Sequence, residues 1–214
     1  MVNVKAGPRD CGYSQSVDVF LLSPAYCGGR RARMLLNPMS QMTLARDLRE
    51  GRLSLGAAFT FMSGLYFRGK LAYVQRFASS LAPARVITPT RGLMLPDGLV
   101  TAELLQEFAT EDVDVEAARY RRALELDAAD LADQLPRDSR IILLGSVATG
   151  KYVDVLEPYF GGRLFFPATF VGRGDMSRGG LMLRASRSGV ELEYAPLVKG
   201  QRPHGRRPPR LSAP

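Results

Sequence analysis

The segment from Gly145 to Lys151 is the part of the chain whose residue types and spacing best fit a site for chemistry. It matches the pattern G-x-x-x-x-G-K of a phosphate-binding loop. The hydroxyl and glycine residues between its ends are Ser146, Thr149 and Gly150. A glycine turn that opens a helix points backbone N–H groups at an anion. Tyr152, however, stands where that motif places a magnesium-binding Ser or Thr, so the pattern predicts either a degenerate nucleotide loop or a tight strand-to-helix turn.

A second segment, residues 172–180, concentrates glycines and charges. It holds four glycines, Arg173, Arg178 and Asp175. One interpretation is a flexible loop that closes over an anionic ligand, with Asp175 as the candidate general base or orienting group. The other is a surface loop in which Asp175 pairs with one of the arginines. We favour the first interpretation and take Asp175 as the catalytic candidate.

Further cations follow two segments that are predicted to be strands. Arg30 and Arg31 follow the apolar run 17–22, and Arg91 follows the strand expected at 84–88. Ligands of parallel sheets bind outside the carboxyl ends of the strands. We therefore expect these arginines to form one phosphate-binding surface with Lys151, Arg173 and Arg178. Asp175 is the one obvious carboxylate in these loops.

Histidine and cysteine are too scarce for several kinds of site. The single histidine, His204, lies in the basic C-terminal segment, which argues against a Ser-His-Asp or Cys-His centre and against a His-rich metal site. Two cysteines, Cys11 and Cys27, are too few for a disulfide framework or a zinc cage. We predict no metal site. Arg30 and Arg31 could favour a Cys27 thiolate, but a packed thiol is the simpler interpretation because no histidine would activate it.

Aromatic residues and cations alternate between residues 66 and 73. The mixture consists of Tyr66, Phe67, Arg68, Lys70 and Tyr73. Such a surface can stack nucleic-acid bases. At helical spacing, however, the same composition is more often half core and half solvated face, and we favour that interpretation.

Composition indicates one globular domain with a basic C-terminal end. The 214 residues are 46% hydrophobic and 23% charged, and the segment after Pro196 supplies +5 of the net charge of +8, which leaves +3 elsewhere. We expect a flexible lead-in at 1–16, a single α/β domain at 17–196 and a disordered basic tail at 197–214. No apolar run approaches the ~20 residues that span a bilayer, and the N-terminus has no signal-peptide core. We therefore expect a cytoplasmic protein without membrane contact.

Alternating strand and helix patterns predict the fold class. Strands are expected at 17–22, 84–88, 141–144 and 163–166, and helices at about 40–50, 65–81, 101–109 and 115–135, with another following Lys151. Ser40 and Thr101 are the expected N-caps of the helices at 40–50 and 101–109. The helix at 65–81 would bury Leu71, Val74, Phe77, Ala78 and Leu81. Segments 181–184 and 190–194 are predicted to form a C-terminal β-hairpin. The result is an α/β, three-layer architecture with a mostly parallel sheet and helices on both faces.

The order of these loops resembles a known group of proteins. Pro24 and Cys27 lie in the first strand-end loop, and a Gly-Leu-x-x-Pro-like element at Gly92, Leu93 and Pro96 follows the second strand. With the Gly-Lys-Tyr turn after the third strand, this order distantly resembles small bacterial α/β proteins and the core domain of archaeosine synthase, which have a uracil-DNA-glycosylase-like fold. The resemblance covers about residues 17–170. It implies a role in nucleic-acid base metabolism, such as modification of a 7-deazaguanine-type base.

Three functions remain open on these patterns. The first is a protein that acts on a nucleotide or a nucleic-acid base through a cationic, glycine-rich site at the strand ends. The second is a non-catalytic module that binds RNA, DNA or an acidic protein. The third is a degenerate P-loop nucleotide-binding protein. The sequence identifies neither a cofactor nor an oligomeric state.

Overall fold

A computed structural model of the chain describes residues 16–80, 82–198, 200, 203 and 205. The predicted lead-in lies outside the described residues except for Ser16, and so do Lys199 and all the arginines of the predicted tail. Leu197, which we expected to begin that tail, is buried, and its N–H donates to the Leu164 carbonyl at 2.8 Å. The folded domain therefore continues past Pro196.

The domain is built on a six-stranded mixed sheet with the order β3-β2-β1-β4-β5-β6. Its parallel strands are β1 (Asp18–Leu22), β2 (Arg85–Ile87), β4 (Arg140–Leu144) and β5 (Leu164–Pro167). Antiparallel strands, β3 (Leu93–Met94) and β6 (Tyr194–Pro196), form the two edges. This confirms the predicted α/β class with a mostly parallel sheet and an antiparallel pair at the C-terminal end.

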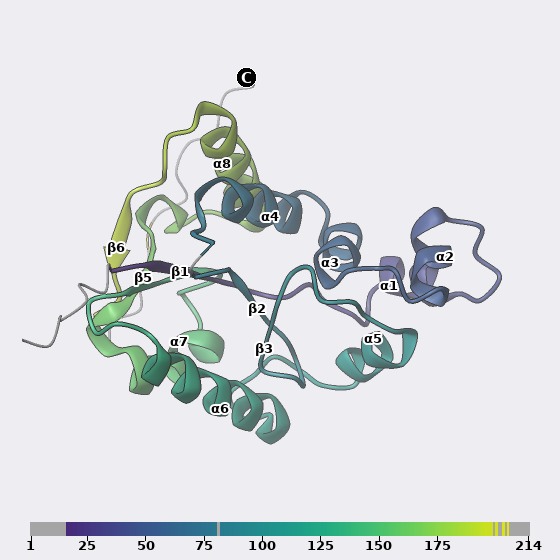
Figure 1. Cartoon of the computed structure of the whole chain (residues 1–214), viewed down its shortest axis with the longest axis horizontal. Coiled ribbons are helices and arrows are strands. Elements are labelled where there is room, and N and C mark those ends of the chain that lie inside the picture. Colours follow the sequence, from purple (N-terminus) through teal and green to yellow (C-terminus); the bar gives the residue numbers. More distant parts are fainter. Residues whose placement is uncertain (1–15, 81, 199, 201–202, 204, 206–214) are drawn as a thin grey trace, which may run out of the picture.

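Helices cover both faces of the sheet. In chain order they are α1 (Arg30–Leu36), α2 (Thr43–Arg49), α3 (Leu55–Ser63), α4 (Leu65–Phe77), α5 (Ala102–Ala109), α6 (Ala118–Gln134), α7 (Gly150–Phe160) and α8 (Asp175–Ser188), with short 3-10 turns η1 (Gly161–Arg163) and η2 (Ala168–Phe170). Figure 1 shows α4 and α8 side by side on one face and α6 and α7 on the other. No helix within the described ranges is both long and apolar enough to cross a membrane.

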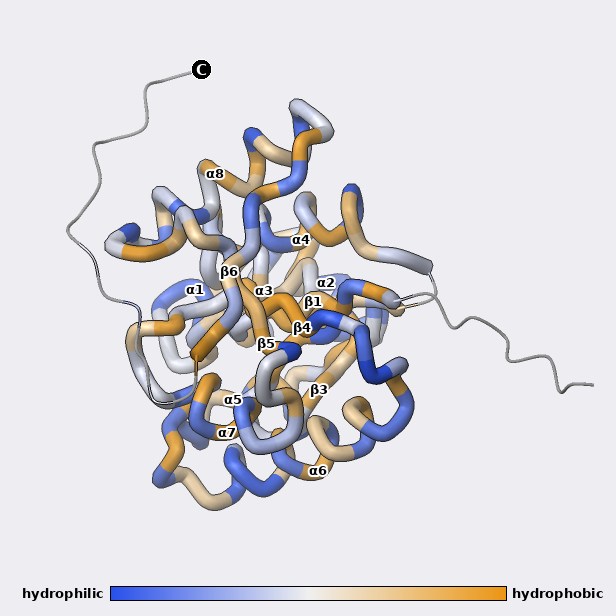
Figure 2. The backbone as a smooth tube through the Cα atoms, turned by 90° about the vertical axis from the view of Figure 1, so that its left-hand side faces the viewer, coloured by the Kyte–Doolittle hydropathy of each residue, from blue (hydrophilic) through white to orange (hydrophobic). Residues whose placement is uncertain are grey.

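The central strands explain why two helical layers form. Phe20 and Leu22 of β1 belong to the core beneath α4 and α8, whereas Val19 and Leu21 belong to the core beneath α6 and α7. Ile141–Leu144 of β4 alternates in the same way. A strand whose side chains are apolar on both faces must be covered on both faces. Figure 2 shows β1 and β4 as hydrophobic tube at the centre of the molecule.

Helices α4 and α8 cross with their backbones in contact. A Cβ atom added at Gly69 would lie 2.6 Å from the Gly179 carbonyl oxygen, and one at Gly179 would lie 2.7 Å from the Leu65 carbonyl oxygen. Only glycine fits at both positions without movement of a backbone. The crossing brings the first turn of α8 next to the first two turns of α4, and both segments carry polar residues of the candidate site.

Several local predictions are corrected by the structure. Residues 181–184 belong to α8 and not to a hairpin strand, and β6 pairs with β5. The segment after Gly29 forms α1, which we had predicted to be loop. The predicted N-cap at Ser40 is also wrong, because Met42 is the residue that precedes α2. In contrast, Thr101 caps α5 as predicted, since its hydroxyl accepts from the Leu104 N–H at 3.2 Å.

Candidate functional site

A cleft of about 720 Å³ opens at the carboxyl ends of the parallel strands. Its wall includes residues 23–27, which follow β1, then Pro89, which follows β2, and Ser146, which follows β4. The first turns of α1, α4 and α7, the start of α8, the ends of α3 and α5 and the link after α5 also line it. The cleft therefore lies where the fold class predicts a ligand.

Charged residues of both signs line this cleft. The cations are Arg30, Arg31 and Lys151. Carboxylates come from the link between α5 and α6 and from the start of α8, and they are Glu111, Asp112, Asp114 and Asp175. The sequence interpretation expected Asp175 alone, so the three acids of the link correct it. A ligand that fits both sets of charges needs an anionic part and hydrogen-bond donors.

Five of the predicted site residues line the cleft. They are Arg30, Arg31, Ser146, Lys151 and Asp175. The Arg31 guanidinium is held by the carbonyl of Phe61, at 3.3 Å from Nη1. Asp175 is the first residue of α8, where a carboxylate interacts favourably with the helix dipole. Its side chain is 68% exposed, and an oxygen lies 3.8 Å from Arg178 Nη1.

The other predicted residues lie outside the cleft lining. Arg91 forms a bidentate ion pair with Glu107, at 2.9 and 2.6 Å, and together with Thr90 it holds the pKa of that carboxyl below its ordinary value. Arg173 donates to the Thr169 carbonyl. Arg178 is buried and donates to the Phe170 carbonyl. The remaining three, which form the turn itself, are Gly145, Thr149 and Gly150.

The predicted strand, turn and helix around Gly145 are present, but Tyr152 is part of the core. Thr149 precedes the first turn of α7 with extended backbone and no side-chain cap. Tyr152 is buried, and burial raises the pKa of its phenol. A phenol that stays protonated in the core is a poor replacement for the magnesium-binding hydroxyl of a phosphate loop. Ser146, Lys151 and the buried Tyr152 are the residues of this segment that line the cleft.

Ser23 and Lys70 form a buried polar pair, of which Ser23 belongs to the cleft wall. The Nζ atom of Lys70 lies 2.6 Å from Ser23 Oγ and 2.8 Å from the Ser23 carbonyl oxygen. Ser23 directly follows β1 and lines the cleft, whereas Lys70 is fully buried in the middle of α4. The Ser23 hydroxyl also lies 3.3 Å from the Leu144 carbonyl oxygen, to which it can donate.

Burial lowers the pKa of Lys70 well below its ordinary value. Asp175 opposes this shift, and the positive charges of Arg178 and Lys151 add to it. Throughout the described part of the chain, no carboxylate forms an ion pair with Lys70. The ring of Tyr66 also lies beside the amine, with its centroid 3.8 Å from Nζ. The neutral amine is the form that such surroundings favour.

The phenol of Tyr66 is the third polar group at this position. Its side chain lines the cleft, and its buried hydroxyl is close to the side chains of Ser23 and Arg178 but meets hydrogen-bond geometry with no residue that the structure describes. Burial raises the pKa of Tyr66 to about 12, and nearby Arg178 and Ser23 offset part of the rise. The group is therefore a protonated donor at neutral pH. An unsatisfied buried hydroxyl at a cleft wall is a ready partner for a ligand.

Cys27 lies in the same wall but is a poor nucleophile. It is buried, and burial raises the pKa of its thiol to about 12. Its Sγ lies 3.7 Å from the Ala25 carbonyl oxygen. The packed thiol is the interpretation that this geometry favours, because only the thiolate is reactive.

Sequence reasoning overlooked Lys70 and the acidic link. Lys70 was grouped with surface cations, yet it stands three residues after Phe67 and three before Tyr73, on the buried stripe of α4. A lysine on an apolar stripe is a visible signal of a buried amine. The place of Glu111, Asp112 and Asp114 in the cleft depends on packing between distant segments, which no local sequence pattern reveals.

Neither a metal centre nor a relative identifies the site. Within the described ranges, no group of three or more His, Cys, Asp or Glu side chains could hold a metal ion. Comparisons with protein-family models, with curated proteins and with solved structures found no match for this chain. The chemistry of the cleft is therefore inferred from its own residues.

Proposed function

We propose that the cleft binds a phosphate-bearing ligand, either a nucleotide or an exposed base of RNA or DNA. The observation that carries this proposal is the meeting of Arg30, Arg31 and Lys151 at the carboxyl ends of β1 and β4. Guanidinium and ammonium groups are the usual protein partners of phosphate oxygens. Lys151 stands in the first turn of α7, where the helix dipole also favours an anion.

Aromatic side chains and carboxylates suit the remainder of such a ligand. Tyr26, whose ring is mostly exposed, and Tyr66 line the cleft beside the cations. Aromatic rings stack on nucleobases, and carboxylates accept hydrogen bonds from their amino groups. Asp112 and Asp114 are exposed acids that line the same cleft. A base with amino or imino donors, such as a guanine-type base, fits this combination best.

The proposal agrees with what the resemblance to the archaeosine synthase core implies. Guanine-type and 7-deazaguanine-type bases are therefore the first ligands to test. A magnesium-dependent P-loop activity is less suited to the site, because Tyr152 replaces the hydroxyl that would bind the metal. Purely structural binding of an acidic protein would not need the acidic wall at Glu111 and Asp112.

Thermal denaturation with a ligand panel tests the proposal. The panel contains GMP, AMP and GTP with and without magnesium, guanosine, tRNA, and single-stranded and double-stranded DNA. A ligand at one hundred times its dissociation constant stabilises the protein by about 2.7 kcal/mol, which raises Tm by roughly 5–11 °C in a domain of this size. We expect a shift with at least one phosphate-bearing member and a smaller shift with guanosine.

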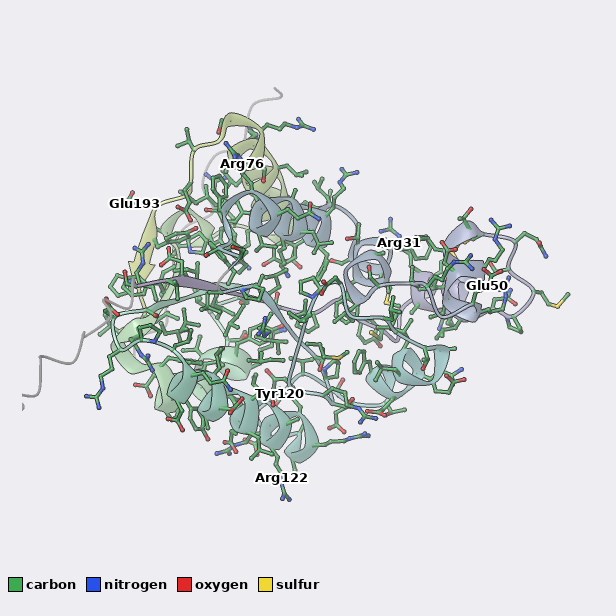
Figure 3. All side chains as sticks on the ribbon, in the orientation of Figure 1. Arg31, Glu50, Arg76, Tyr120, Arg122 and Glu193 are labelled. Carbon is green, nitrogen blue, oxygen red and sulfur yellow. The ribbon has the colours of Figure 1, made fainter. Side chains whose placement is uncertain are left out.

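Charge-deletion variants locate the binding surface. Lys151→Ala and Arg30→Ala should weaken binding, and Arg91→Ala should not, because Glu107 already holds the Arg91 guanidinium. Arg122 of α6 is exposed and extends away from the molecule (Figure 3), so Arg122→Ala is the matched control for loss of one positive charge. No shift with any ligand, or equal losses in all four variants, would refute the proposal.

A further inference from the structure

The Ser23–Lys70 pair has an arrangement that phosphate binding does not require. Ser23 lines the cleft although it is only 4% exposed, and the amine 2.6 Å from its Oγ is fully shut off from solvent. An amine that served as a phosphate ligand would have to reach the cleft, which Lys70 does not. Placed where it is, Lys70 can act on a ligand only through Ser23.

We propose that Ser23 and Lys70 are the nucleophile and general base of an acyl-transfer site, which acts on an ester or amide of a phosphate-bearing molecule. The choice of molecule rests on the proposed function, whereas the Ser23–Lys70 chemistry does not. A serine hydroxyl is a weak nucleophile until a neighbouring base removes its proton. Serine with lysine is one of the known solutions to that requirement on unrelated folds.

The reaction balances with water as the only co-reactant. Ser23 Oγ bonds to the carbonyl carbon while its proton passes to the neutral amine of Lys70. The tetrahedral intermediate then expels the alcohol or amine, which takes the proton from Lys70 and leaves an acyl-serine. Water attacks this ester and gives its proton to Lys70. Release of the carboxylic acid leaves the serine oxygen, which recovers the proton from Lys70.

Tyr66 supplies the donor that such a reaction needs. Negative charge develops on the carbonyl oxygen in the intermediate, and a hydrogen-bond donor placed at that oxygen stabilises it. The Tyr66 hydroxyl is buried, is unpartnered among the described residues, and lies in the same wall as Ser23. A hydroxyl that donates to the intermediate would have no hydrogen-bond partner before substrate binds, as is found for Tyr66 among the residues that the structure describes. Tyr66 thus contributes to the reaction without changing its own protonation.

The groups around Lys70 determine the pH range of the reaction. Tyr66 faces it from α4 itself, Asp175 and Arg178 from α8, and Lys151 and Tyr152 from α7. Burial keeps the amine neutral, Arg178 and Lys151 add to this effect, and Asp175 favours its protonation. Because only the neutral amine can accept the serine proton, acylation should slow as the pH falls through the pKa of Lys70.

A fluorophosphonate probe and p-nitrophenyl acetate test the inference on the full chain. Both react with an activated serine whatever its natural substrate is. We expect the probe to label a single peptide, the one that contains Ser23. We also expect measurable hydrolysis of p-nitrophenyl acetate. Ser23→Ala should abolish both, and Lys70→Met should slow both at least 100-fold. Ser80→Ala, which removes an exposed serine outside the cleft, should leave both unchanged.

If Lys70→Met does not fold, the pH dependence of labelling in the wild type still tests the proposal. In the wild type, the labelling rate should fall about tenfold per pH unit below the pKa of Lys70. Labelling at other serines, or a rate that does not depend on Lys70, would overturn the proposal. Nucleotide-induced stabilisation without Ser23 labelling would refute the acyl-transfer chemistry alone. Ser23 labelling in a protein that no nucleotide stabilises would refute only the phosphate-bearing substrate.

Discussion

The amine of Lys70 lies 2.6 Å from the hydroxyl of Ser23, although 47 residues separate them in the chain. Ser23 is positioned by the end of β1, and Lys70 by the middle of α4, which crosses the sheet above it. The amine also donates to the Ser23 carbonyl oxygen at 2.8 Å. Two contacts to one residue hold the side chain of Lys70 in a single orientation, with the serine between it and the cleft.

Lys70→Met should change the pH dependence of stability. The folded state lowers the pKa of Lys70, so between that value and about 10.4 the unfolded chain binds a proton that the folded chain does not bind. The free energy of unfolding of the wild type should therefore rise with pH in this window relative to Lys70→Met, by up to about 1.4 kcal/mol per pH unit. Urea denaturation of both proteins at pH 7, 8 and 9 measures the difference. A constant difference would mean that Lys70 remains charged in the folded protein.

Tyr66→Phe should leave the protein at least as stable as the wild type. The substitution removes a buried hydroxyl that has no partner in the described structure, and relief of such a group is worth about 1 kcal/mol. Tyr73→Phe, on the same helix, is the contrast, because the Tyr73 hydroxyl contacts the Tyr194 hydroxyl at 2.6 Å and accepts from the Leu192 N–H at 2.9 Å. It should cost roughly 1–2 kcal/mol. Urea denaturation that gives equal losses for both variants would contradict the assignment of Tyr66.

Asp175→Asn distinguishes two roles for the carboxylate. If Asp175 were the general base, as the sequence suggested, the variant would lose p-nitrophenyl acetate hydrolysis at every pH. If Lys70 is the base, the negative charge of Asp175 only raises the pKa of Lys70, and its removal lowers that pKa further. The rising limb of the pH–rate profile should then move to lower pH, with the plateau rate retained. Loss of the plateau would favour Asp175.

Gly69→Ala should destabilise the domain even though alanine is the better helix former. The new Cβ would lie 2.6 Å from the Gly179 carbonyl oxygen, so the backbones of α4 and α8 must move apart. Overpacking of this kind costs about 1–3 kcal/mol. Gly162→Ala is the matched control, since no atom lies within 4 Å of its added Cβ. Similar urea midpoints for both variants would show that the crossing is looser than described.

Cys27 should react slowly with alkylating reagents in the folded protein. Burial raises the pKa of its thiol from 9.0 to about 12, which at pH 8 lowers the thiolate fraction roughly 1,000-fold. Mass spectrometry of iodoacetamide labelling in a Cys11→Ser background measures the rate with and without urea. Comparable rates in the two conditions would mean that the Cys27 thiol is accessible and ionised.

The strands at the centre of the sheet could be predicted because their signal is local. Ile141–Leu144 is apolar on both faces, and a continuous apolar run of this length is typical of a doubly covered strand. The cap at Thr101 is equally local, since a threonine directly before an amphipathic segment marks a helix start. These elements determine the sheet order and thus the place of the cleft.

Helix α8 could not be predicted because its stability is not local. Gly179 and Gly180 each disfavour a helix by about 1 kcal/mol relative to alanine, and with Gly172 and Gly174 they indicate a loop. The contact with α4 reverses that preference, since Gly179 is the residue that permits the close crossing. The same limit applies to the cleft, whose acidic wall at Glu111 and Asp112 depends on how a connecting segment is placed beside α1 and α7.

The crossing at Gly69 and Gly179 also has an evolutionary consequence. Either glycine can be replaced only if the opposite backbone withdraws, so a substitution at one position changes what selection permits at the other. Among descendants of a common ancestor, the two sites should vary together even though they belong to different helices. Homologues that share this arrangement should have small residues at both positions and a lysine directly after the first.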